Sequence, residues 1–143
     1  MLKIATEEDF DLVFKHCKAF SSTLKQKDLV TDEKLKALIT EFLTSPKEQK
    51  IILLHGEEGM LAAFITPFLL GTEPTATELA WWVIPEARKK NIGKELIDAY
   101  EFWAKKLDCK CIVLSCYADN DLGKFYEKLG YVLHEKTYYK ELN

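Results

Sequence analysis

A basic turn in the second half of the chain has residue types that bind phosphate groups. The turn comprises Arg88, Lys89, Lys90, Asn91, Ile92, Gly93 and Lys94. It follows an apolar stretch that includes Val83 and Ile84 and stops at Pro85. A helical pattern begins near Asn91, so the turn opens a helix, whose N-terminus offers unpaired N–H groups and a positive dipole end. Gly93 lets a ligand approach the backbone closely, and asparagine tolerates positive φ. The pattern predicts a diphosphate-binding turn; the alternative is a capped helix with a solvated basic turn.

Apolar periodicity predicts the elements that position this turn. Helical spacing favours helices over residues 6–20, 31–45, 91–107 and 119–129. Strands are expected at residues 2–5, 50–55, 60–70, 78–84, 110–117 and 131–139, with loops at 21–30 and 71–77. A strand–helix–strand unit must cross over right-handed. The order predicts an α/β domain with a mixed, mostly antiparallel central sheet flanked by helices.

Length and charge exclude several classes of protein. The chain has 143 residues and a net charge of −3, which indicates one domain over residues 1–143 and argues against a nucleic-acid binder. No apolar run is long enough for a membrane span, and the start has no signal-peptide core, so we expect a cytoplasmic protein. The cysteines are expected to be free thiols, and Cys109 and Cys111 lack a nearby histidine for zinc, so no metal is expected.

Two motifs resemble the GNAT (Gcn5-related N-acetyltransferase) superfamily. Arg88-x-x-Asn91-x-Gly93 is similar to its acyl-CoA-binding motif, with Asn91 where the family usually has glycine. Phe125-Tyr126-Glu127-Lys128-Leu129-Gly130-Tyr131 looks like the later motif of the family. The resemblance implies the acyl-CoA N-acyltransferase fold and acetyl-CoA as cosubstrate.

The resemblance also implies roles for individual residues. Tyr126 matches the tyrosine that protonates the departing thiolate, although its stripe with Phe125 and Leu129 is also typical of core. Glu78 lies near the place of a general base in some members, and partial burial would raise its pKa toward neutrality. Backbone groups near Val83 and Ile84 would pair with the pantetheine arm, and Asn120 would contact it.

These expectations favour an N-acetyltransferase that moves the acetyl group to a primary amine by direct attack in a ternary complex. The alternatives are a non-catalytic CoA-binding module, an α/β interaction domain, and acyl transfer through Cys116, a position that is more typical of buried strand core. The acceptor is expected to be a small-molecule or peptide amine whose identity the sequence does not reveal. A homodimer through a strand edge at Tyr138 and Tyr139 stays open.

Overall fold

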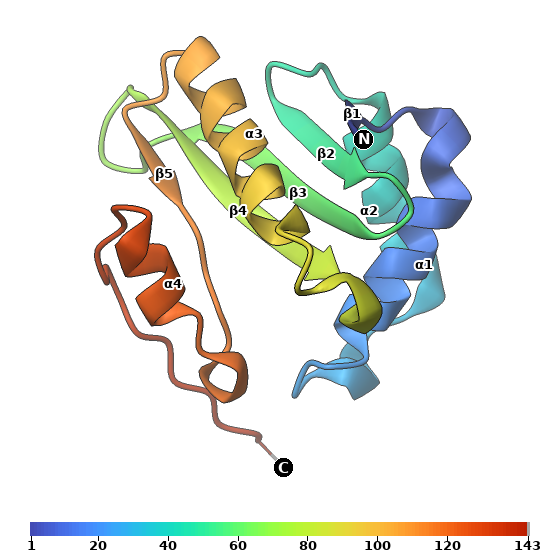
Figure 1. Cartoon of the computed structure of the whole chain (residues 1–143). Helices are drawn as coiled ribbons and strands as arrows, with labels where there is room; N and C mark the ends of the chain where they lie inside the picture. The colour runs from blue at the N-terminus through green and yellow to red at the C-terminus, as the bar shows by residue number, and fades with distance from the viewer. Residues whose placement is uncertain (143) are drawn as a thin grey trace.

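A five-stranded sheet forms the centre of the molecule, and its strands lie side by side in chain order (Figure 1). This computed structural model describes residues 1–142. The strands are β1 (Leu2–Ile4), β2 (Lys50–His55), β3 (Gly59–Pro67), β4 (Pro74–Val83) and β5 (Cys111–Val113). The first four run antiparallel, and β5 runs parallel to β4. The predicted mixed, mostly antiparallel sheet is therefore confirmed.

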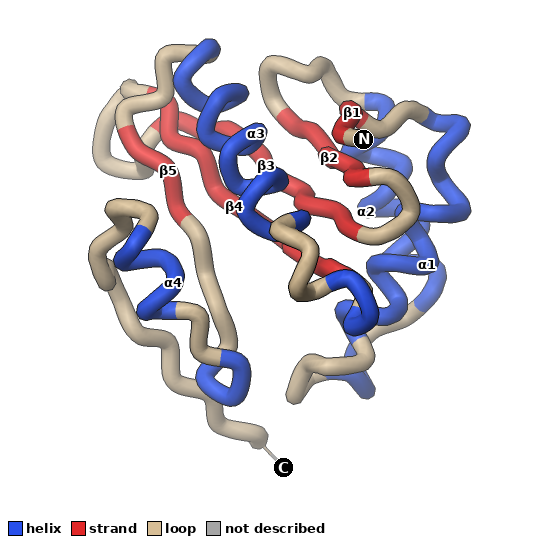
Figure 2. Tube along the Cα trace, in the orientation of Figure 1, coloured by secondary structure: helices blue, strands red, loops and turns tan. Residues whose placement is uncertain are grey.

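Helices cover both faces of the sheet (Figure 2). On one face lie α1 (Phe10–Ser21) and α2 (Asp32–Thr44), which pack with the inward residues of β2 and β3 around Val13, Ile39 and Phe42. On the other face lie α3 (Ile92–Lys106) and α4 (Gly123–Lys128), whose core includes Leu96 and Tyr126. We call these the α1 face and the α3 face. No helix in the described part of the chain is both long and apolar enough to span a membrane.

Strand β4 contains an extra residue that changes which side chains face each helix layer. Ala62 pairs with Ala80 whereas Ala63 pairs with Glu78, so Leu79 forms a β-bulge. Because of this bulge, Ala76 and Trp81 both belong to the core of the α3 face. Trp82 packs on the α1 face, so the two neighbouring tryptophans point to opposite faces of the sheet.

Some predicted boundaries are wrong. Strand β4 begins at Pro74, inside the predicted loop, because proline fits the first position of a strand and Thr75 and Thr77 favour extended backbone. The predicted strand 110–117 ends at Val113, where its pairing with β4 ends. The predicted helix 119–129 is reduced to a short turn at Ala118–Asn120 followed by α4.

The strand predicted at residues 131–139 is absent. Residues 131–142 form neither helix nor strand, and Val132 and Leu133 are 85% and 72% exposed. The alternating pattern is real, but within the described residues no strand pairs with this segment, and a strand is stable only beside a neighbour.

Candidate active site

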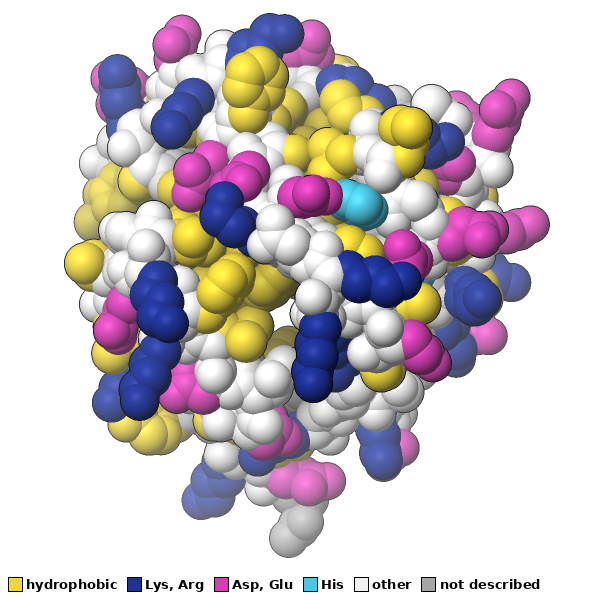
Figure 3. Space-filling view, viewed as in Figure 1, with side chains coloured by type: hydrophobic (Ala, Val, Ile, Leu, Met, Phe, Trp, Pro, Cys, Tyr) yellow, Lys and Arg dark blue, Asp and Glu magenta, His cyan; other side chains and the backbone are white. Residues whose placement is uncertain are grey.

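The sheet opens where β4 and β5 separate. They pair only from Thr75–Cys111 to Thr77–Val113, while β4 continues to Val83 with β3 alone beside it. From Glu78 onward, no strand of the described chain lies along the other edge of β4. Figure 1 shows the segment after β5 turning away from β4, and Figure 3 shows a hollow in this region with hydrophobic side chains on one side and Lys or Arg on the other.

The backbone direction shows which amide groups face this opening. The Ile84 N–H donates to the Glu58 carbonyl at 2.9 Å, so Ile84 points toward β3. The backbone N–H and C=O groups of successive residues in a strand point to opposite edges. Those of Trp81 and Val83 therefore point toward the open edge. Arg88 Nε donates to the Val83 carbonyl at 3.0 Å. The N–H groups of Trp81 and Val83 therefore face the open edge, whereas that of Ile84 is already bonded to Glu58.

Two side chains meet on the main chain of Ser115 at the head of the opening. The Ser115 N–H donates to Glu78 Oε1 at 3.2 Å. The Tyr126 hydroxyl donates to the Ser115 carbonyl at 2.8 Å. The structure thus brings Glu78 of β4 and Tyr126 of α4 to one residue, 37 and 11 positions from them in the chain.

Burial changes the acidity of both groups. It raises the pKa of the Glu78 carboxyl from 4.5 to about 7, and the Ser115 N–H only partly opposes this shift. The direction is the one expected from the sequence, and it leaves the carboxyl able to exchange a proton near neutral pH. Burial and then the nearby charge of Glu78 raise the pKa of Tyr126 above its usual range, so the phenol keeps its proton.

The turn before α3 has the backbone that the sequence indicates. Asn91 is the N-terminal cap of α3 and adopts the left-handed conformation with φ of 66°. Its side chain makes no capping hydrogen bond, so the first-turn N–H groups at Ile92, Gly93 and Lys94 have no side-chain cap there. Ile92 itself is buried in the core, so only its backbone faces outward.

The cations of this turn have different environments. The Arg88 guanidinium lies 4.9 Å from the centre of the Trp82 ring, in addition to its bond to Val83. Lys90 pairs with Glu58 at 3.0 Å and Lys94 with Asp98 at 2.7 Å. Lys89 is exposed and has no carboxylate partner among the described residues. It is the cation of this turn most available to an anionic ligand.

Gly93 has a packing role that the sequence did not indicate. A Cβ atom at this position would lie 2.7 Å from Cζ2 of Trp81, which is too close. Glycine therefore lets the start of α3 pack against β4. A larger residue here would disturb the fold as well as any ligand, so it makes a poor test of phosphate binding.

Two other residues singled out from the sequence, Asn120 and Cys116, are exposed in the segment between β5 and α4. Asn120 is exposed in the turn before α4, where its N–H donates to the Tyr117 carbonyl at 2.9 Å. Cys116 is exposed rather than buried in a strand, and its Sγ accepts from the Leu122 N–H at 3.4 Å. Within residues 1–142, no group of three or more His, Cys, Asp or Glu could hold a metal ion.

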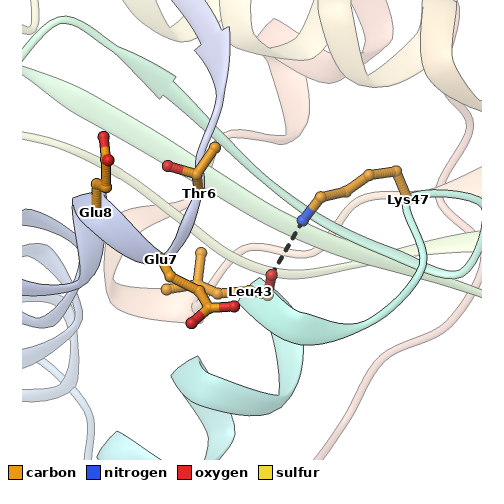
Figure 4. A pocket seen from close by; sticks show the side chains of 5 residues that line it. All are labelled: Thr6, Glu7, Glu8, Leu43 and Lys47. Atoms are coloured by element: carbon orange, nitrogen blue, oxygen red, sulfur yellow. Dashed lines mark hydrogen bonds between the residues drawn. The ribbon is translucent and has the colours of Figure 1, made fainter.

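A separate shallow pocket lies away from these residues (Figure 4). It is lined by Thr6, Glu7, Glu8, Leu43 and Lys47, and Lys47 Nζ donates to the Leu43 carbonyl at 3.4 Å. None of these residues belongs to β4, β5 or α4, so the pocket is not part of the Ser115 site.

Comparison with known proteins identifies the family. The family model described as "Acetyltransferase (GNAT) family" matches residues 16–131. The chain therefore belongs to the GNAT acetyltransferase family. No curated protein matches the sequence.

Solved structures agree with this fold at low sequence identity. Glucosamine-6-phosphate N-acetyltransferase from Arabidopsis thaliana is 19% identical, with a TM-score of 0.72 over 100% of this chain and 99% of that one. AAC(6')-Iy, solved with the bisubstrate analogue CoA-S-monomethyl-acetylneamine, is 16% identical, with a TM-score of 0.78 over 100% and 97%. A transcriptional regulator from Bacillus halodurans C-125 is 21% identical, with a TM-score of 0.78 over 99% of each chain. These similarities establish the GNAT fold but not a substrate.

Proposed function

We propose that this chain is an N-acetyltransferase that moves the acetyl group of acetyl-CoA to a primary amine by direct attack in a ternary complex. The observation that carries the proposal is the meeting of Glu78 and Tyr126 on Ser115, beside the open edge of β4. A group able to take a proton and a group able to give one stand on either side of one residue, as acyl transfer to an amine requires.

The chain's own groups fit acetyl-CoA, which supplies an acyl carbon activated as a thioester. The free N–H groups of Trp81 and Val83 suit an extended chain that carries amide carbonyls, as the pantetheine arm does. The first turn of α3, with Asn91 in the left-handed conformation and Lys89 beside it, suits the diphosphate. Both features lie along the same opening in the sheet.

In this proposal Glu78 is the general base and Tyr126 the general acid. A carboxylate with a pKa of about 7 can accept a proton from the attacking nitrogen near neutral pH. The Tyr126 hydroxyl donates to Ser115, and rotation about its C–O bond would direct the same proton toward a departing sulfur. Its raised pKa keeps the donor protonated until the sulfur departs.

Ligand binding gives the first test. CoA or acetyl-CoA should raise the melting temperature. At a ligand concentration about 100 times Kd, the free energy of unfolding should increase by roughly 2.7 kcal/mol. Lys89→Glu should weaken CoA binding by about tenfold through one lost charged contact. Lys105→Glu, which makes the same charge change near the far end of α3, should not. An unchanged melting temperature with millimolar CoA would contradict the proposed cofactor site.

Turnover gives the second test. Release of free CoA thiol from acetyl-CoA in the presence of primary amines should exceed its release without them. Tight CoA binding without transfer to any amine of a broad panel would instead favour the non-catalytic CoA-binding module.

A further inference from the structure

An aromatic pair bridges the opening on the side opposite α3. The rings of Phe20, near the end of α1, and Tyr117, two residues after Ser115, lie 6.4 Å apart between centroids and are tilted by 54°. Helix α1 covers the other face of the sheet from α3 and α4. The aromatic pair, meaning Phe20 and Tyr117, therefore lies where the opening reaches the α1 face.

Glu78 connects this aromatic pair to the Ser115 site. Its carboxylate accepts from Ser115, and its charge, after burial, raises the pKa of Tyr117. The carboxylate is thus held by the main chain two residues before Tyr117. In the described residues, Glu78 forms no ion pair with any Lys, Arg or His, and only its Oε1 has a hydrogen-bond partner.

This arrangement has the chemistry that attracts an organic cation. Ring faces carry partial negative charge and attract ammonium groups within about 6 Å of their centres. Tyr117 is 49% exposed, so part of its ring is free to contact a ligand. The Glu78 carboxylate, which has no ion-pair partner among the described residues, adds a net negative charge that the rings lack when it is deprotonated.

We propose that Phe20 and Tyr117 form the acceptor entrance of the site and select amines that arrive as alkylammonium ions. The inference rests on the proposed function, because it names which acceptors that site takes. The ammonium passes the rings and gives one proton to the Glu78 carboxylate, leaving a neutral amine and a carboxylic acid. The nitrogen then bonds to the acyl carbon as the C–S bond breaks, and Tyr126 gives its proton to the departing sulfur. The surplus proton on the acylated nitrogen passes to the Tyr126 oxygen, and Glu78 later releases its proton to water. An amine with a carboxylate on the same carbon is repelled by Glu78 and by the ring faces.

The experiment compares pentylamine with 2-aminohexanoic acid, which adds a carboxylate beside the amine. Wild-type enzyme should acetylate pentylamine with a kcat/KM at least about tenfold higher. Phe20→Leu and Tyr117→Leu should each raise the KM for pentylamine about 5- to 30-fold. They should leave kcat within about threefold and the Kd of acetyl-CoA unchanged. Tyr117→Phe keeps the ring and should behave as wild type.

Phe14→Leu is the matched control, because Phe14 also lies on α1 but stacks on Phe10 instead. Melting temperatures show whether Phe20→Leu folds, and the half-exposed Tyr117 gives the safer variant. An unchanged KM in Tyr117→Leu, or equal use of both probes, would overturn the aromatic entrance while acetyl transfer stands. Bound CoA with neither probe acetylated would also overturn it, whereas failure to bind CoA would refute the proposed function itself.

Discussion

Tyr126 has two separable roles at the scale of the single residue. Its hydroxyl holds the Ser115 carbonyl, and in the proposed mechanism it also protonates the departing sulfur. Tyr126→Phe should lower kcat and kcat/KM together by about 10²–10⁴-fold and leave acetyl-CoA affinity nearly unchanged. Loss of the hydrogen bond should cost about 1 kcal/mol of unfolding free energy.

Tyr131→Phe is the control for this change. The Tyr131 hydroxyl donates to Glu101 at 2.7 Å, away from Ser115. Each variant loses one hydroxyl and one hydrogen bond, but only Tyr126→Phe should slow the chemistry. A rate for Tyr126→Phe within about threefold of wild type, with acyl transfer shown to limit kcat, would exclude the proposed general acid.

Glu78 should make the protein less stable as the pH rises. The pKa of this carboxyl is about 7 in the folded chain against an ordinary 4.5, so the folded state holds the proton more tightly. Between these two values the unfolded chain has released the proton, and the free energy of unfolding therefore falls with pH, by at most about 3 kcal/mol. Below pH 4.5 both states are protonated and the effect is absent.

Glu78→Gln should remove this slope, because the amide oxygen can still accept from Ser115 but carries no charge. Denaturant unfolding should show the variant more stable than wild type at pH 8 and no more stable at pH 4. In the wild type, kcat/KM should rise as the pH passes about 7, and the variant should lack this limb. Parallel pH–stability curves for the two proteins would contradict the raised pKa.

The turn before α3 determines a prediction at the scale of elements. Asn91 stands at φ of 66°, a conformation that costs most L-residues about 1–2 kcal/mol. Asn91→Ala should therefore lower stability by about 1 kcal/mol, whereas Asn91→Gly should be at least as stable as wild type and bind CoA as well. Calorimetry and denaturant melts measure both effects.

Asp108, which follows α3 at φ of 58°, supplies the matched position. Asp108→Ala should have a similar stability cost and no effect on CoA binding. If Asn91→Gly bound CoA more weakly than wild type, the asparagine side chain itself would be a ligand contact.

The sequence predicts the elements better than it predicts their ends. Periodicity located β2, α1, α2 and α3, because each presents an apolar side to a core that the chain itself supplies. It failed at residues 131–139, where the alternation is present but no strand among residues 1–142 lies beside it, since pairing depends on the rest of the molecule. The bulge at Leu79 has no composition signal, so the shared face of Ala76 and Trp81 could not be foreseen.

The site could be predicted only in part for a related reason. The resemblance to the GNAT superfamily indicated Glu78 and Tyr126, and the residue types of the basic turn indicated Asn91. Ser115 contributes its main chain, which every residue has. Tyr117 contacts the Phe20 ring on α1, which lies nearly a hundred residues earlier in the sequence. Neither leaves a local pattern.

At the scale of the whole molecule, protection of backbone amides against hydrogen exchange should be greatest in the centre of the sheet. Strand β3 is paired on both sides, by β2 and β4, and its residues Met60–Ala63 are buried. Residues 132–142 lie in no helix or strand and are exposed. Hydrogen exchange of the intact protein should be slowest in β3 and fastest in 132–142. Strong protection across 132–142 would show that this segment pairs in solution.

The use of the Ser115 main chain has a consequence for mutational tolerance. Its N–H and C=O orient both proposed catalytic side chains, while its own side chain is exposed. Most substitutions at position 115 keep both groups, but proline has no N–H to offer Glu78. In a saturation mutagenesis screen, position 115 should therefore accept nearly every residue except proline. Such a profile is typical of a position where function requires the backbone N–H and C=O groups but not a particular side chain.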